Sequence, residues 1–279
     1  MHDIPIGAVI AFNFQSWDIR EEVALLQEVG IHRVQIYRNY GQGITAKAIR
    51  ETLDAAGFVA DGLHGYFELE GFEGPPCDPS SAVPAARRAV LEIMRGEADY
   101  ARVLGCRDII VHPAGSDSRP EDSFRAEALV STAAGLAEIG RNTGVRFLFE
   151  NMPPTMFGRD AAVLRRIVDT VASPHVGLAY DSGHAALAGD AVGTIQIMGP
   201  RIWGVHIHDT RGLEDDHLIP GLGIVPFEEV ARALAKVGYE GTFILEIYRS
   251  TAEVRRDLTP ERLAFIERLR RLASGRDQA

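Results

Sequence analysis

Residues 202–238 have the sequence IWGVHIHDTRGLEDDHLIPGLGIVPFEEVARALAKVG, in which the hydrophobic pattern changes twice. The run 202–208 alternates in the manner of a β-strand, whereas 209–225 is too irregular for a strand or a helix. Pro226 then precedes a run with helical periodicity that ends at Gly238. Proline is common at the first position of a helix and glycine just past its end, so this stretch predicts a strand, a long loop and a helix.

The same succession of a short strand and a longer helix recurs along the 279 residues. Eight runs are predicted to be strands: 6–11, 33–37, 59–64, 108–112, 146–150, 176–181, 202–208 and 242–247. Two helical runs follow the capping residue types Ser16 and Thr45, and two stop at Gly30 and Gly57. Eight such units in about 250 to 280 residues favour a closed (β/α)8 TIM barrel. An open doubly wound sheet is the alternative, because the sequence does not show whether the first strand pairs with the last.

The composition bounds the class of protein. Hydrophobic residues make up 46% of the chain and charged residues 24%, which is enough to bury a large core. No linker rich in serine, proline or glycine divides the sequence, so we expect a single domain over residues 1–279. The net charge of −10 disfavours a nucleic-acid partner. Two cysteines, Cys77 and Cys106, are too few for a disulfide framework and fit reduced thiols in the cytosol.

Two segments bear on location and assembly. The apolar run 4–14 lacks a basic leader and a cleavage site, so it predicts a strand rather than a signal peptide. No stretch approaches the roughly 20 apolar residues of a membrane span, and we expect a cytoplasmic protein without a membrane partner. The amphipathic run 261–272 is expected to close the barrel wall. A subunit contact is its second interpretation, which leaves a homo-oligomer open.

Polar side chains gather where the predicted strands end. Alternate residues of a barrel strand face the axis, so parity selects those that meet there. Parity directs Trp203 outward to the helix layer and directs five polar residues inward: Glu150, Asp181, His206, His208 and Glu246. Six of the nine histidines lie at or just after the ends of strands: His64, His112, His184, His206, His208 and His217. The loops 65–83 and 209–225 follow strands three and seven, over the face where barrel enzymes keep their sites.

Carboxylates and imidazoles that converge from different strands are typical of a divalent-metal site. Four residues form the predicted ligand set: Glu150, Asp181, His206 and Glu246. Three carboxylates and one imidazole can hold Mn, Co, Mg or Zn and leave positions for substrate oxygens. Burying facing carboxylates without a cation would be costly. Since no cysteine joins the set, an open catalytic site is favoured over a closed structural zinc.

Six motifs resemble the successive signatures of the xylose-isomerase-like TIM barrel superfamily. They are IIVHPAG (109–115), LFEN (148–151), YDSGH (180–184), HIHD (206–209), Asp215-x-His217-Leu-x-Pro-Gly-x-Gly (215–223) and LEIY (245–248). The resemblance runs from the third strand to the eighth, which is most of the chain. That superfamily includes sugar isomerases and epimerases, related dehydratases and endonuclease IV.

The resemblance implies a role for each matching position. The four predicted ligands resemble the metal tetrad of the sugar isomerases and epimerases, in which Glu150 and Glu246 also form the proton-transfer pair and His184 contacts a substrate hydroxyl. Five residues resemble the additional zinc ligands of endonuclease IV: His64, His112, His184, Asp215 and His217. Of these, His64, His112 and His184 are candidates either as ligands or as hydrogen-bond partners of the substrate.

Other residues near the strand ends are weaker candidates. Arg211 is a candidate to bind a substrate phosphate or carboxylate, although a solvated loop arginine is the more ordinary outcome. His208 is expected to support a ligand, and Asp209 to orient an imidazole. Seven aromatic residues are candidates to wall off a sugar, although core packing explains most such residues: Phe12, Phe14, Trp17, Tyr66, Phe67, Phe157 and Tyr248.

We therefore expect a divalent-metal-dependent isomerase or epimerase of a small sugar or related polyhydroxy carbonyl compound. Proton transfer would pass through a metal-stabilised enediolate, with Glu150 and Glu246 as base and acid. The alternatives are a multinuclear-zinc phosphoesterase resembling endonuclease IV, a dehydratase of the same superfamily and a non-catalytic sugar-binding barrel. The short loop 13–17 and the acidic charge disfavour DNA as the substrate. The substrate, its phosphorylation, the native metal, the number of ions and the oligomeric state are left open.

Overall fold

Eight parallel strands close into a barrel in the computed structural model, which describes residues 4–14, 18–40, 43–66, 77–119 and 122–276. Closure is direct, because β1 pairs with both β2 and β8. The strands are β1 Ile6–Phe12, β2 Arg33–Arg38, β3 Val59–His64, β4 Asp108–Val111, β5 Arg146–Glu150, β6 Val176–Asp181, β7 Ile202–Ile207 and β8 Phe243–Leu245. The predicted (β/α)8 barrel is confirmed, and the open sheet is excluded.

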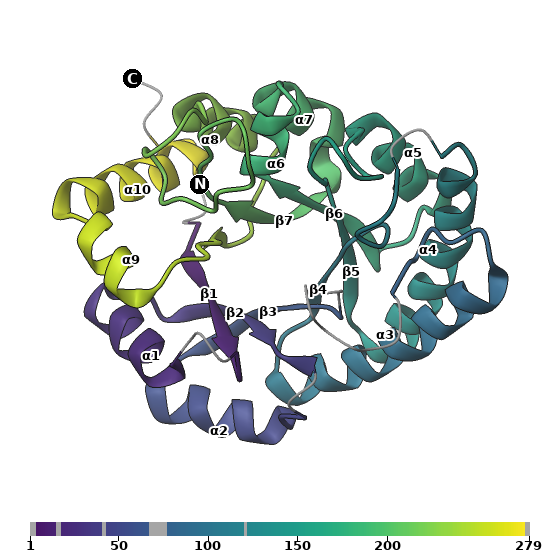
Figure 1. The fold of residues 1–279 in the computed structure, drawn as a ribbon, viewed down its shortest axis with the longest axis horizontal. Helices are drawn as coiled ribbons and strands as arrows, with labels where there is room; N and C mark the ends of the chain where they lie inside the picture. Colours follow the sequence, from purple (N-terminus) through teal and green to yellow (C-terminus); the bar gives the residue numbers. More distant parts are fainter. Residues whose placement is uncertain (1–3, 15–17, 41–42, 67–76, 120–121, 277–279) are drawn as a thin grey trace.

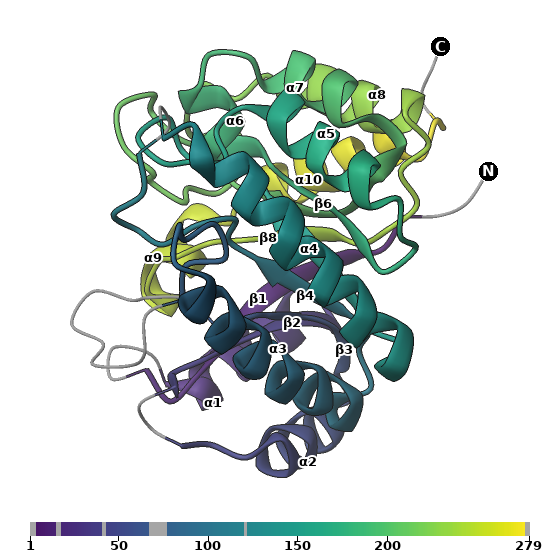
Figure 2. The same cartoon turned by 90° about the vertical axis from the view of Figure 1, so that its right-hand side faces the viewer.

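Helices form a ring outside the strands (Figure 1). They are α1 Ile19–Glu28, α2 Ala46–Ala56, α3 Pro84–Leu104, α4 Phe124–Thr143, α5 Ala161–Val171, α6 Ser182–Leu187, α7 Ala191–Met198, α8 Phe227–Lys236, α9 Thr251–Asp257 and α10 Pro260–Ala273, with the short 3-10 helix η2 Gly199–Arg201 before β7. Figure 2 shows α3 and α4 side by side along one wall. The amphipathic C-terminal run forms α10, which packs against α8 and covers the wall as expected.

The helix ends follow the local sequence closely. Thr45 caps α2 as predicted, since its hydroxyl accepts the N–H of Ala48. The cap of α1 is Asp18, and Ser16 lies outside the described residues. Gly57 ends α2 with a φ of 74°, a left-handed conformation that residues with a Cβ rarely adopt. None of the helices in these ranges combines the length and the apolar character needed to cross a membrane.

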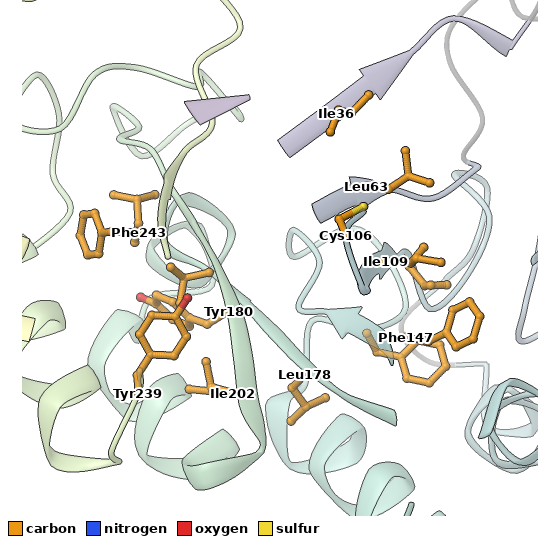
Figure 3. Close-up of a cluster of buried hydrophobic side chains, with 14 of the residues drawn as sticks. Ile36, Leu63, Cys106, Ile109, Phe147, Leu178, Tyr180, Ile202, Tyr239 and Phe243 are labelled. Atoms are coloured by element: carbon orange, nitrogen blue, oxygen red, sulfur yellow. The ribbon is translucent and has the colours of Figure 1, made fainter. Parts of the chain in front are cut away.

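The main core lies between the strands and the helices. Side chains of one parity on successive strands fill it, and Figure 3 shows part of this layer, including Ile36, Leu63, Ile109, Phe147 and Leu178. Burying each such side chain contributes about 1.5 to 3 kcal/mol relative to leaving it exposed. The barrel interior has a much smaller apolar cluster, which consists of Ile110, Leu148 and Ala179. The inward-facing positions at the carboxyl ends of the strands are therefore available to polar residues.

Trp203 departs from the predicted parity. The pairing of β7 with β6 shifts by one residue between Leu178 and Ala179, which makes Trp203 an extra residue in the ladder. A Cβ on Gly177 would lie 2.3 Å from the Trp203 indole, so the ring fills the space over this glycine beside the inner cluster. The prediction that Trp203 faces the helix layer is therefore wrong. Val205 follows the bulge and does face that layer.

Candidate metal and active site

Among the described residues, three adjoining groups of imidazoles and carboxylates lie at the carboxyl ends of the strands, and within each group the donor atoms are within 4.8 Å of one another. The central cluster consists of Glu150, Asp181, His206 and Glu246. The first flanking cluster consists of His64, His112 and Glu150. The second flanking cluster consists of His184, His208, Asp215 and His217. The structure thus brings together every residue of the predicted ligand set and of the additional set.

The strand ends position the central cluster. Glu150 is the last residue of β5, Asp181 is the last of β6, and Glu246 directly follows β8. Asn151 fixes the start of this turn, because its side-chain amide donates to the Asp181 carbonyl at 3.0 Å and accepts the Asp181 N–H at 2.8 Å. Asp181 in turn caps α6 by accepting the N–H of His184 at 2.7 Å. These hydrogen bonds therefore fix the backbone where β6 ends and α6 begins.

The Nδ1 atom of His206 is the meeting point of the three carboxylates. It lies 2.7 Å from Oε1 of Glu150, 3.3 Å from Oε1 of Glu246 and 3.9 Å from Oδ2 of Asp181. All four side chains are buried. Three acids in so small a buried volume repel one another strongly unless a positive charge lies among them.

In the protein without an ion, that positive charge is the imidazolium of His206. Burial favours neutral His206, but Glu246, Glu150 and Asp181 outweigh it and raise its pKa to about 9. Burial likewise favours protonated Glu150, yet His206 and the other imidazoles hold the pKa of this carboxyl well below its ordinary value. Glu150 is therefore ionised, which is the state in which carboxylates bind metals.

The donor set fits a divalent cation. Oε2 of Glu150 and Oε2 of Glu246 are buried and have no hydrogen-bond partner in the described part of the chain. Buried carboxyl oxygens of this kind are costly unless a cation or a donor contacts them. Mixed nitrogen and oxygen donors suit Zn or Mn, and the carboxylates also suit Mg. Glu150, Asp181, His206 and Glu246 therefore offer what such an ion needs.

The first flanking cluster shares Glu150 with the central one. The Nε2 atoms of His112 and His64 lie 3.4 Å and 3.8 Å from Oε2 of Glu150. The two rings meet edge to face, with their centroids 5.0 Å apart. Burial lowers the pKa of His64, which favours the neutral imidazole that can act as a ligand. Oε2 of Glu150 can therefore reach either cluster.

Asp215 joins the members of the second flanking cluster. Its Oδ2 atom lies 3.0 Å from Nε2 of His184 and 3.1 Å from Nε2 of His217. Burial would raise the pKa of Asp215, but the hydrogen bonds with these two imidazoles lower it well below its ordinary value. His208 stacks on His217 at 4.1 Å and contacts the proposed ligand Asp181 at 3.0 Å.

Asp209 organises the loop that carries Asp215 and His217. Its carboxylate accepts four backbone N–H groups at 2.7 to 3.0 Å, from Thr210, Gly221, Gly223 and Val225. The expectation that Asp209 orients an imidazole is wrong, because its oxygens are occupied by the backbone of its own loop. The carboxylate is buried, and it closes the irregular stretch 209–225 into a fixed turn over the barrel mouth.

The remaining candidates lie in different places. Arg211 is largely exposed and bonds to Asp216 at 3.0 Å, and the structure does not bring it into any of the three clusters. Tyr248 stands at the site, with its ring 4.3 Å from that of His217. Phe12, Tyr66 and Phe157 lie in the main core. Phe14 packs against the small cluster of Ala11 and Tyr37, as Tyr248 does. Trp17 and Phe67 lie outside the described residues.

Sequence reasoning missed two residues of β2 that contact the central cluster. Oε1 of Gln35 lies 2.7 Å from Nε2 of His206, and the hydroxyl of Tyr37 donates to Oε1 of Glu246. The signal was present, because polar residues alternate along the run 33–38 (RVQIYR) with the period of an inward-facing strand side.

The chain belongs to the xylose isomerase-like TIM barrel family, whose model matches residues 23–271. It is 32% identical over 177 residues to Uncharacterized protein MJ1311 of Methanocaldococcus jannaschii, an alignment that covers 61% of this chain and 60% of that protein. The chain spans between about a third and three fifths of the length of the first curated relatives that it matches. The family assignment confirms the resemblance found in the motifs.

Solved structures share the fold over nearly the whole chain. A D-tagatose 3-epimerase-like protein superimposes with a TM-score of 0.75 at 22% identity, covering 97% of this chain and 99% of that one. A D-allulose 3-epimerase from Methylomonas sp. also gives a TM-score of 0.75, at 17% identity, with coverage of 96% and 100%. At these identities the likeness establishes the shared barrel.

Proposed function

We propose that this protein is a divalent-metal-dependent isomerase or epimerase of a small sugar or related polyhydroxy carbonyl compound. One observation carries the proposal: Glu150 and Glu246 converge on Nδ1 of His206, and each keeps a buried Oε2 without a hydrogen-bond partner among the described residues. They come from β5 and from the end of β8, with two strands between them. Two carboxylates in this arrangement can reach a substrate from different sides. The fold shared with a D-tagatose 3-epimerase-like protein and a D-allulose 3-epimerase supports the choice of substrate class.

The ion would be held by Glu150, Asp181, His206 and Glu246, and it supplies Lewis-acid stabilisation of the negative charge that develops on a carbonyl substrate. Glu150 acts as the base that removes the proton next to the carbonyl, and Glu246 acts as the acid that returns one. An epimerisation then leaves Glu150 protonated and Glu246 ionised. Exchange of these protons with water resets the pair, so solvent hydrogen enters the product.

Three imidazoles are proposed to bind the hydroxyl groups of the substrate. His64 and His112 lie on the Glu150 side of the central cluster, and His184 lies on the Asp215 side. Arg211 is the candidate to bind a charged group of the substrate. To do so, its side chain has to leave Asp216, with which it pairs in this structure. Tyr248 offers a ring face beside His217. The site therefore has polar groups on two sides and an aromatic wall.

Hydrogen exchange tests the proposal directly. The protein is incubated with Mn or Co and a panel of aldoses and ketoses in deuterated water, and deuterium next to the carbonyl is measured by NMR. We expect exchange, and a loss of about 10²- to 10⁴-fold in Glu150→Gln and Glu246→Gln. Glu127→Gln, a change at an exposed position of α4 outside the three clusters, is the control. Metal-loaded protein that exchanges no substrate across the panel would contradict the proposal.

The two flanking clusters favour a second candidate, a multinuclear-zinc phosphoesterase. The first flanking cluster adds two imidazoles to the shared Glu150, and the second offers four donors of its own. Elemental analysis of the purified protein separates the candidates, because one ion per chain favours the isomerase and three favour the hydrolase. A dehydratase shares the first proton abstraction, and loss of water from the substrate would identify it.

A further inference from the structure

Strand β2 contributes no donor to the three clusters, yet two of its side chains contact the central one. Gln35 and Tyr37 are two residues apart, so both point to the barrel axis, and both are buried. Gln35 contacts His206, and Tyr37 contacts Glu246. One strand thus reaches two of the four proposed ligands from the side opposite β6.

The contact with Gln35 distinguishes the two ring nitrogens of His206. Nδ1 faces Glu150 at 2.7 Å, and Nε2 faces Oε1 of Gln35 at 2.7 Å. An amide oxygen only accepts hydrogen bonds, so Nε2 carries a proton and Nδ1 is the nitrogen whose lone pair can face an ion. Gly62 on β3 lies beside the amide, since a Cβ there would be in van der Waals contact with Nε2 of Gln35 at 3.4 Å.

The contact with Tyr37 distinguishes the two oxygens of Glu246. The Tyr37 hydroxyl donates to Oε1, whereas Oε2 is buried and has no hydrogen-bond partner among the described residues. A phenol hydroxyl has a proton to donate and a carboxylate oxygen can only accept one, so Tyr37 is the donor in this contact. The ring is held in turn by His64 at 4.5 Å and by Tyr248 at 5.6 Å.

We propose that Gln35 and Tyr37 are positioning residues for the metal site: Gln35 fixes His206 in the tautomer that turns Nδ1 toward the ion, and Tyr37 turns Oε2 of Glu246 into the site. The inference rests on the proposed metal site and deepens it. Partners behind a ligand commonly change metal affinity by about 10- to 100-fold when removed. A purely structural role for the two residues would lower stability and leave affinity and tautomer as they are.

The test uses the full chain and Zn²⁺ alone. Affinity is measured by competition with a chromophoric chelator, and the His206 tautomer by long-range ¹H–¹⁵N NMR of histidine-labelled protein, with the signal assigned by its loss in His206→Asn. We expect the proton on Nε2 in zinc-loaded wild type. Gln35→Leu and Tyr37→Phe should each weaken zinc binding by about 10- to 100-fold. Gln35→Glu keeps the acceptor, so it should keep the tautomer and bind zinc at least as tightly as wild type.

Tyr239→Phe is the matched control for the tyrosine, because Tyr239 is also buried and its hydroxyl donates to the Thr242 carbonyl away from the clusters. It should lower the melting temperature about as much as Tyr37→Phe and leave zinc affinity unchanged. Wild-type affinity in both Gln35→Leu and Tyr37→Phe, or a proton on Nδ1 of His206 in loaded wild type, would overturn the inference. Wild-type protein that binds no zinc overturns it together with the proposed function. If zinc binding responds to the variants as expected but no sugar exchanges hydrogen, only the proposed reaction is contradicted.

Discussion

His206 and Glu150 are 56 residues apart in the chain, and Nδ1 of the one lies 2.7 Å from Oε1 of the other. A proton occupies this contact in the metal-free protein, since the carboxylates raise the pKa of His206 to about 9. An ion that binds Nδ1 must displace that proton. Below pH 9 the apparent metal affinity should therefore rise with pH, by up to about tenfold per pH unit.

Calorimetric titration with Zn²⁺ at pH 6, 7 and 8, in buffers of different ionisation enthalpy, measures both the affinity and the protons released. We expect close to one proton per ion at pH 7 from the central cluster. His32→Gln, which changes a histidine outside the three clusters, should leave the release unaltered. An affinity that is flat between pH 6 and 8 would show that His206 is already neutral.

The second prediction concerns Asp209, whose carboxylate accepts four N–H groups of its own loop. Asp209→Ala leaves these donors unpaired, and a buried unpaired donor costs about 1 to 3 kcal/mol, partly relieved where water enters. We expect a loss of about 2 to 4 kcal/mol in the free energy of unfolding and faster amide hydrogen exchange at Gly221, Gly223 and Val225. Asp216→Asn, on the same loop, should have a smaller effect because the amide keeps an oxygen that can accept the Arg211 N–H, and the Arg211 side chain of the ion pair is largely exposed. Unchanged protection of the three amides in Asp209→Ala would contradict this account of the loop.

Much of the fold follows from patterns that the chain carries locally. Each strand alternates, so the periodicity of RFLFE and VGLAYD gave the bounds of β5 and β6 as they are found. The closure of the barrel could be predicted only from the number of units, since pairing of β1 with β8 is a contact between the two ends of the chain. The position of the polar clusters then followed from the rule that parallel strands end on one face.

The sequence did not reveal features that depend on contacts between elements. Trp203 turned inward because a bulge arises in the pairing of β7 with β6, and the alternation of β7 alone does not show it. The prediction for Asp209 is wrong because its four N–H partners become neighbours only once the loop has closed. Gln35 lies 171 residues from His206, so its polar character could be noticed but its partner could not.

The third prediction concerns Glu22 on α1. Its side chain lines a small, mainly apolar cavity of about 70 Å³ between α1, β8 and α9, and it accepts the Ala11 N–H at 2.8 Å. Burial raises its pKa to about 7. The native state thus binds this proton more tightly than the unfolded chain does. The stabilisation of the native state by protonated Glu22 is fully present below about pH 4.5 and is lost as the pH rises through about 7.

Glu22→Gln keeps an acceptor for Ala11 and removes the titration. The variant should be more stable than wild type at pH 8, by on the order of 1 kcal/mol because solvent screens part of the effect, and the difference should shrink toward zero at pH 5. Urea unfolding at both pH values measures it. Glu127→Gln, at an exposed position, should follow wild type at both. A Glu22→Gln variant that is less stable at pH 8 would mean that the ionised carboxylate is tolerated in this cavity.

The fourth prediction concerns the buried ion pair of Arg38 and Glu97, which joins the end of β2 to α3 behind the site. The guanidinium also lies over the Tyr100 ring at 3.6 Å, and its NH1 atom is buried without a hydrogen-bond partner in the described ranges. Glu97→Leu removes the only carboxylate that pairs with this cation among those residues. Leaving a buried charge unpaired costs about 3 to 5 kcal/mol.

Urea unfolding of Glu97→Leu should show a loss of that size, and the double variant Arg38→Met/Glu97→Leu should recover most of it, because two apolar side chains of similar volume need no partner. Lys47→Met/Glu51→Leu, which replaces an exposed ion pair on α2, should change stability by less than about 1 kcal/mol. If the double variant is as unstable as Glu97→Leu, the cost lies in the packing around Tyr40 and Tyr100 rather than in the unpaired charge. The β2 strand that carries Arg38 also carries Gln35 and Tyr37, so we expect the single variant, and not the double one, to weaken zinc binding at the central cluster as well.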